Sequence, residues 1–205
     1  QQSGYDHWAS LGNRGWGWQD VLPVFRRSED YQHGADDFHG SGGELRVEER
    51  RVNWEILDVW RDAAAQCGIP KIDEFNRGDN FGNAYFQMNQ RQGKRWSAVR
   101  AFLDPIRERT NLTILTEASV RELIFDKDSA EIKATGVKVL HAGHEHVFQA
   151  NAEVILAAGA IASPQLLQLS GIGSSEALQN HGVTPRLELP GVGENLQDHL
   201  QIRTI

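Results

Sequence analysis

The sequence predicts a mixed α/β fold, and three observations support this prediction. Residues 152–173, AEVILAAGAIASPQLLQLSGIG, have the pattern of a short apolar strand, a bend of small residues and an amphipathic helix. Strand-like runs follow one another from Leu112 to Ala157, which indicates hairpins beside a parallel unit. Residues 53–67 carry apolar side chains at three- and four-residue spacing, which is the clearest helical pattern in the chain.

The first half of the chain is expected to be mainly helical. Asn53 can cap the helix over 53–67, and Gly68 followed by Pro70 ends it. The single cysteine, Cys67, comes late in this pattern and is expected to be a buried structural thiol. The other elements expected here are helices at 6–11, 18–30 and 97–107, and strands at 44–47 and 84–88.

The second half is rich in Val, Ile, Leu and Thr and is expected to hold most of the strands. In the helix that follows residue 157, Ser163 can act as the cap, Pro164 fits the first turn and Gly171 closes the helix. The elements expected in this half are strands at 112–115, 120–125, 135–140, 147–150 and 154–157, and helices at 163–169 and 174–181.

Composition excludes several classes of protein. The net charge of −7 argues against a nucleic-acid-binding surface, which needs a basic face. No apolar run reaches the roughly 18 residues of a membrane span. The opening residues, QQSGYDHW, lack the basic-then-apolar pattern of a secretory signal, so a cytoplasmic location is expected, with membrane association of the whole protein left open. All six tryptophans lie in the first half, which suggests two differently built regions in an internal piece of a larger protein.

The bend of small residues at 157–160 allows two interpretations. A bend with almost no side chains lets a flat or charged ligand approach the backbone, at a helix N-terminus that favours negative charge. Small residues also serve close packing of a strand on a helix, with no ligand present. The segment 189–199, LPGVGENLQDH, is similarly ambiguous: it is either a loop that reaches a polar ligand or a simple reversal of the chain.

Two motifs that contain histidine suggest sites that other arguments disfavour. His141, His144 and His146 are residue types that bind zinc, but they bracket Ala142 and Gly143 in a predicted hairpin turn, so no metal site is expected. The adjacent pair Asp198 and His199 could act as an acid–base pair. Neighbouring residues on a strand point to opposite faces, so a shared role would require a loop.

The sequence resembles the glucose–methanol–choline (GMC) oxidoreductases over nearly its whole length. The segments 5–30, 38–47, 93–105 and 190–199 look like segments of that family in the same order. The second signature of the family is matched at every fixed position, by Gly159, Ala160, Ser163, Pro164, Leu166, Leu167, Ser170, Gly171, Ile172 and Gly173.

The resemblance implies a fold and a cofactor. The implied fold is part of a Rossmann-like FAD-binding domain interleaved with part of an antiparallel-sheet substrate domain. Residues 1–30 would be a helical segment associated with the FAD domain, residues 31–110 mainly substrate domain and residues 111–205 mainly FAD-binding domain. The glycine-rich turn that holds the FAD pyrophosphate, and the catalytic histidine with its partner, are expected outside this chain.

The resemblance also implies roles for particular residues, all of them in cofactor binding. Val120 matches a valine whose backbone contacts the adenine, and Ala158 and Gly159 match the bare turn against the FAD. Asp198 and His199 match a loop near the isoalloxazine, and no residue of this chain matches the catalytic positions.

The expected function is that of a fragment of an FAD-dependent enzyme that oxidises a small primary alcohol to an aldehyde, with the fragment alone inactive and prone to self-association. Two alternatives stay open: a non-catalytic binding domain derived from the same fold, and a hydrolase that uses Asp198 and His199 but has no nucleophile motif.

Overall fold

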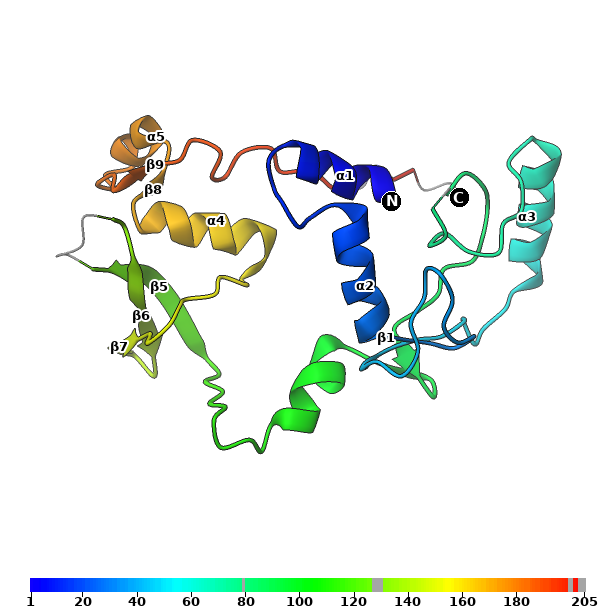
Figure 1. Ribbon diagram of the computed structural model, residues 1–205, viewed down its shortest axis with the longest axis horizontal. Coiled ribbons are helices and arrows are strands. Elements are labelled where there is room, and N and C mark those ends of the chain that lie inside the picture. Colours follow the sequence, from blue (N-terminus) through cyan, green and yellow to red (C-terminus); the bar gives the residue numbers. More distant parts are fainter. Residues whose placement is uncertain (79, 127–130, 199–200, 203–205) are drawn as a thin grey trace. The chain divides into compact units, whose positions relative to one another are not determined.

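The computed structural model describes residues 1–78, 80–126, 131–198 and 201–202. The chain divides into two compact units, Gln1–Thr113 (unit 1) and Ile114–Ile205 (unit 2). Figure 1 shows unit 1 in blue to green and unit 2 in green to red. The assignment of parts of the chain to a cofactor domain and a substrate domain stays a prediction.

Unit 1 begins with two helices, α1 (Gln2–Ser10) and α2 (Trp18–Ser28). Aromatic side chains join them, with Tyr5 of α1 packing its ring 6.0 Å from that of Trp18 and 5.7 Å from that of Phe25. A carboxylate of α1 satisfies one of the free N–H groups at the start of α2: the N–H of Trp18 donates to Asp6 Oδ1 over 2.9 Å. The first helix therefore serves as a cap and an apolar support for the second.

The rest of unit 1 is built from short elements. Strands β1 (Glu29–Tyr31) and β2 (Leu45–Val47) pair in parallel, and β3 (Gln90–Arg91) forms a hairpin with β4 (Lys94–Arg95). The longest helix of this unit is α3 (Glu55–Gln66), and a π-helical turn, η1 (Val99–Leu103), leads into a 3₁₀ turn, η2 (Asp104–Ile106).

Three predictions for unit 1 are wrong in detail. The helix predicted over 97–107 is a π turn followed by a 3₁₀ turn, and the proline at position 105 explains the break in regular α-helix. Residues 84–88 form only an isolated bridge between Met88 and Glu48, because they have no longer partner strand in the described part of the chain. Cys67 is exposed and not buried, since it lies one residue past the end of α3.

Unit 2 contains an antiparallel sheet in the order β5–β6–β7, formed by Ala118–Phe125, Ala134–His141 and His144–Gln149. The turn between β6 and β7 is the predicted hairpin, with positive φ angles of 50° at Ala142 and 80° at Gly143. The groups of acidic, histidine and cysteine residues in the described ranges include no set that could hold a metal ion.

A second group of elements packs on this sheet. Helix α4 (Gly159–Leu169) contacts β5, and the two-residue strand β8 (Ile172–Gly173) pairs in parallel with β9 (Leu187–Glu188). Helix α5 (Ser175–Asn180) lies between β8 and β9 in sequence, where the sequence predicts a helix over 174–181, and the side chain of Ser174 caps it. The core of unit 2 consists of Leu123, Val139, Leu166, Ile172 and Leu178.

Two predicted strands of unit 2 are absent from the described residues. Residues 112–115 and 154–157 have no regular secondary structure, because no strand in the described ranges pairs with them and a strand forms only through such pairing. Helix α4 begins at Gly159, four residues before the predicted Ser163, so Ser163 lies inside the helix.

Large apolar side chains stay exposed in both units, among them Ile56 and Trp60 on α3, Trp54 just before it, and Ile161 on α4. Within the part of the chain that the structure describes, the helices are all too short or too polar to cross a membrane.

Candidate cofactor-binding site

The bend before α4 is bare and faces open space. Gly159 has a φ of +89°, and a β-carbon placed on it would meet no other atom within 4 Å. The N–H of the preceding residue, Ala158, donates to Ser163 Oγ over 3.0 Å, so Ser163 holds the bend from inside the helix. The first N–H groups of α4 have no partner within the helix, and the helix dipole makes this end attractive to an anion.

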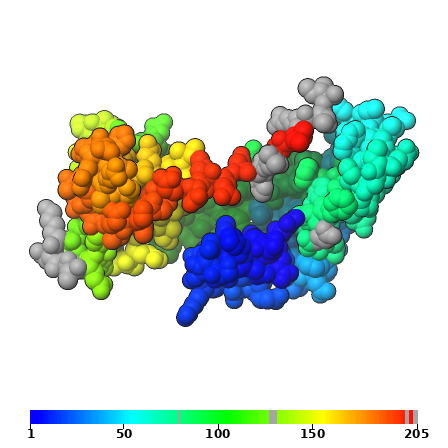
Figure 2. Space-filling view, turned by 90° about the horizontal axis from the view of Figure 1, so that it is seen from above, coloured from blue at the N-terminus to red at the C-terminus, as the bar shows by residue number. Residues whose placement is uncertain are grey.

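A groove of about 490 Å³ lies along α4, within the 300–1,000 Å³ typical of small-molecule sites. One wall is a face of the helix and the other is the segment 193–197, and the lining residues on the helix are Ala160, Ile161, Pro164, Gln165 and Gln168. The segment is exposed at the surface, where Figure 2 draws it in red, running on from α5 in orange.

Contacts between α4 and this segment fix the far end of the groove. Gln168 Nε2 donates to the carbonyl of Val192 over 3.2 Å. Gly193 has a φ of +87°, and a β-carbon there would lie 2.6 Å from Gln168 Nε2. Only glycine therefore allows the segment to approach the helix so closely without displacing the glutamine.

The structure brings together some of the predicted site residues. Ala158 and Gly159 form the bend, and the segment that contains Asp198 lines the groove up to residue 197. Asp198 is exposed, and His199 lies outside the described residues. Val120 lies on β5, paired with Val139 and 42% exposed, and it does not line this groove.

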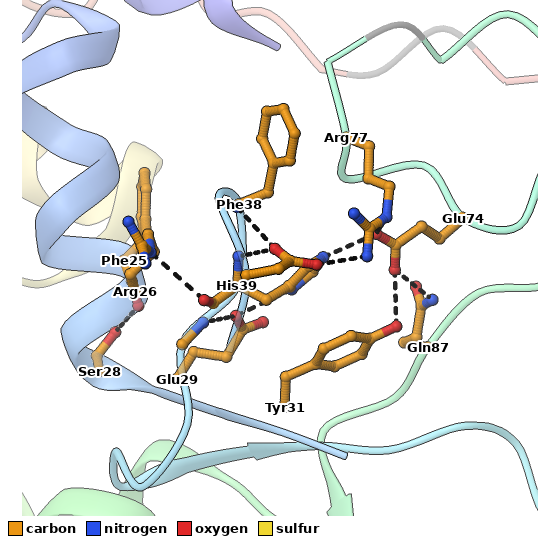
Figure 3. Close-up of polar contacts among 12 residues, drawn as sticks. Phe25, Arg26, Ser28, Glu29, Tyr31, Phe38, His39, Glu74, Arg77 and Gln87 are labelled. Carbon is orange, nitrogen blue, oxygen red and sulfur yellow. Dashed lines mark hydrogen bonds and ion pairs between the residues drawn. The ribbon is translucent and has the colours of Figure 1, made fainter. Parts of the chain in front are cut away.

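Unit 1 contains a buried polar cluster that sequence reasoning missed (Figure 3). His39 is 3% exposed, and its two ring nitrogens contact two carboxylates: Nδ1 lies 3.0 Å from Glu29 Oε2 and Nε2 lies 2.8 Å from Glu74 Oε1. An ionised carboxylate only accepts hydrogen bonds, so both contacts are hydrogen bonds only when both ring nitrogens carry hydrogen.

Glu74 is the centre of this cluster. Its Oε2 accepts hydrogen bonds from the hydroxyl of Tyr31 at 2.8 Å and from Gln87 Nε2 at 3.0 Å, and its Oε1 lies 2.6 Å from Arg77 Nε. Figure 3 shows these side chains converging on the carboxylate. Both oxygens of the Glu74 carboxylate accept contacts from neighbouring side chains, so the cluster ties these segments of unit 1 together.

The cluster affects the ionisation of Tyr31. Burial raises the pKa of the Tyr31 phenol above its ordinary value of 10.0, and the hydrogen bond to the Glu74 carboxylate raises the pKa further. The Tyr31 ring also stacks on His39 with a centroid distance of 4.0 Å. The only signal in the sequence was the HGSGG run after Phe38, because Glu74 lies 35 residues from His39 with no pattern linking them.

Replacing Tyr31 with phenylalanine is expected to destabilise unit 1 by about 1–3 kcal/mol, because the buried Glu74 loses a donor while the ring stacking remains. Because the pKa of Tyr31 is raised in the folded state, its hydroxyl makes its full contribution to the free energy of unfolding below pH 10.0. That contribution is lost as the pH rises above this value. The stability difference between the wild type and Y31F, measured by denaturant unfolding, should therefore narrow above pH 10.0. Y85F, which removes a hydroxyl bonded to the exposed Asp58, is the control and should change stability less. An equal effect of the two substitutions would contradict the assignment.

Comparison with solved structures defines the class of protein. The chain superposes on pyridoxine 4-oxidase from Mesorbium loti with a TM-score of 0.88 and 35% identity, covering 97% of this chain and 39% of that one. It superposes on an FAD-dependent oxidoreductase from Chaetomium thermophilum with a TM-score of 0.87 and 29% identity, covering 97% of this chain and 36% of that one. The fold is therefore part of the α/β fold of the FAD-dependent oxidoreductases.

Sequence comparison then gives the family. The model of the GMC oxidoreductases matches residues 1–201. Human mitochondrial choline dehydrogenase is 39% identical over 198 residues, which are 97% of this chain and 33% of that protein. An oxygen-dependent choline dehydrogenase of Yersinia pseudotuberculosis is 41% identical over 204 residues, covering 97% of this chain and 35% of that protein. The chain belongs to the GMC oxidoreductase family, whose members are FAD-dependent enzymes, and it spans about a third of the length of these relatives.

The residues at the bend and along α4 fit a flavin nucleotide. The helix N-terminus suits a phosphate, and the open side of Gly159 admits a ligand against the main chain. Beside the bend, Ile155 is 78% exposed and Ile161 is 73% exposed, and such apolar surface suits the flat rings of the cofactor.

Proposed function

We propose that the protein containing this chain oxidises a primary alcohol, choline or a similar small molecule, to an aldehyde, and that this chain forms part of its FAD site. The observation that carries the proposal is the bare bend at Gly159, which opens onto free space at the N-terminus of α4 beside a groove of about 490 Å³. The names of the similar choline dehydrogenases support the class of substrate.

The chain's own residues bind and orient in this proposal. Ala158 and Gly159 lie against the cofactor, the N–H groups at the start of α4 neutralise a phosphate, and the backbone of Val120 contacts the adenine. Asp198 and His199 belong to the loop near the isoalloxazine. FAD, when bound, accepts the hydride from the alcohol carbon, and the histidine that takes the hydroxyl proton belongs to the remainder of the protein.

The proposal is tested with a Gly159→Leu substitution in the full-length protein. The leucine side chain would extend into the space proposed for FAD, so the FAD dissociation constant of the apoprotein should rise by about 100-fold or more, equivalent to about 2.7 kcal/mol. The measurement is a titration of the apoprotein with FAD, followed by flavin fluorescence.

Gly182→Leu is the matched control. Gly182 also has a positive φ, +73°, and a β-carbon there also meets nothing within 4 Å, but it follows the C-terminal end of α5 and is not part of the bend at the start of α4. The backbone strain is therefore similar in both variants, and G182L should bind FAD as the wild type does. Equal FAD affinity in G159L and the wild type would refute the proposed site. A wild-type protein that binds FAD but is not reduced by choline or other primary alcohols would refute the proposed reaction and favour a binding domain of the same fold.

A further inference from the structure

Ser170 is a buried polar side chain that joins two elements of unit 2. It follows the last residue of α4 and is 4% exposed. Its Oγ donates to the carbonyl of Leu166 over 2.6 Å and accepts from the N–H of Leu123 over 2.8 Å. A hydroxyl has one hydrogen and two lone pairs, so it makes both bonds at the same time.

The bond to Leu123 is made at the outer edge of the sheet. Among the strands that the structure describes, β5 pairs with β6 alone, so the N–H groups on its other side need partners from elsewhere. The Ser170 hydroxyl supplies one of these partners in the buried middle of the strand, where Leu123 is 7% exposed. The end of α4 is thereby fixed at one point along β5.

Gly171, the residue after Ser170, packs closely against the backbone of residues 184–187. Gly171 has a φ of +87°, and a β-carbon there would lie 2.6 Å from the carbonyl oxygen of Thr184. The carbonyl of Gly171 accepts from the N–H groups of Arg186 at 2.8 Å and Leu187 at 3.2 Å. Ser170 therefore cannot shift along β5 without disturbing the contacts between Gly171 and the backbone of residues 184–187.

The two elements joined by Ser170 carry two parts of the proposed FAD site. Gly159 lies at the opposite end of α4, an 11-residue helix about 16 Å long. Val120 lies on β5, three residues before Leu123. A small displacement of the helix at Ser170 would therefore move the Gly159 bend relative to Val120.

We propose that Ser170 is a positioning residue for FAD: its hydroxyl sets the distance between the Gly159 bend and Val120, so that one cofactor molecule contacts both. This inference rests on the proposed function, because it assumes that both residues contact FAD. It assigns Ser170 no contact with the cofactor itself.

The test is Ser170→Ala in the full-length protein, compared with Ser174→Ala. S174A also removes a hydroxyl that accepts from a backbone N–H, but this N–H is that of Ala177 in α5 and does not belong to β5. S170A should raise the FAD dissociation constant about 10-fold and change the visible circular dichroism of the bound flavin. S174A should lower the thermal stability of the apoprotein while leaving both FAD measurements at their wild-type values.

The outcomes separate this inference from the proposed function. If S170A lowers thermal stability but leaves FAD affinity and circular dichroism unchanged, Ser170 is only structural and the inference is overturned. If G159L also leaves FAD affinity unchanged, the proposed cofactor site fails instead. If S170A does not fold, Ser170→Cys is measured in its place, because a thiol is a weak donor and acceptor of similar size. A raised FAD dissociation constant in S170C supports the inference, and an unchanged one overturns it.

Discussion

Replacing Glu74 with alanine is expected to destabilise unit 1 by about 3–5 kcal/mol, the usual effect of removing one member of a buried charged network. The Glu74 side chain is 2% exposed and contacts the side chains of Tyr31, His39, Arg77 and Gln87. Its removal leaves two buried donors, the Tyr31 hydroxyl and His39 Nε2, without their partner, whereas Arg77 and Gln87 keep hydrogen bonds to other carboxylates. The cost comes from these orphaned groups more than from the loss of the carboxylate's own interactions.

Amide hydrogen exchange in the full-length protein measures this effect locally. Protection of the backbone in segments 29–31 and 39–40 should fall by about 100-fold or more, since each tenfold change corresponds to about 1.4 kcal/mol. Asp104→Ala is the control, because Asp104 pairs with Arg107 at the surface, and such pairs contribute about 0–1 kcal/mol. Unchanged protection in E74A would show that the cluster does not hold these segments together.

Replacing Gly40 with alanine is expected to destabilise unit 1 by about 3 kcal/mol or more, because the new methyl group has no space. A β-carbon on Gly40 would lie 1.6 Å from the carbonyl oxygen of Arg26, near the end of α2. The neighbouring atoms belong to the backbone, so no side-chain rotation relieves the overlap. The loop would have to move away from α2 and would take His39 out of contact with Glu29.

Gly42→Ala is the matched control in the same loop. Gly42 has a φ of +79°, but a β-carbon there meets nothing within 4 Å, so the substitution costs only the strain of the left-handed backbone, about 1 kcal/mol. Thermal unfolding of the two full-length variants should therefore give a clearly lower midpoint for G40A than for G42A. The reverse order would contradict the close approach of this loop to α2.

The elements that could be predicted from the sequence are those whose pattern is local. The helix over 53–67, the hairpin turn at Ala142 and Gly143 and the helix over 174–181 each depend on residues within a few positions of one another. The bare bend at Ala158 and Gly159 was predicted for the same reason, since small residues are visible in the sequence itself.

The features that were mispredicted or missed depend on distant partners. Residues 154–157 have the alternation of a strand, with Ile155 78% exposed between half-buried neighbours, but no described strand pairs with them. The bond between His39 and Glu74 joins loops 35 residues apart, and nothing in either loop indicates the other. The sequence also showed Ser170 only as part of a signature, because its partner, the N–H of Leu123, lies 47 residues away.

The distance in sequence between the members of the Glu74 cluster also determines when it can assemble during protein synthesis. Glu29 and His39 leave the ribosome before Glu74, which follows His39 by 35 residues. At about 5–20 residues per second, translation of that interval takes roughly 2–7 s. Throughout this time the nascent polypeptide presents a histidine and a tyrosine whose common carboxylate has not yet been made, so this region is open to chaperones and proteases until Glu74 has emerged.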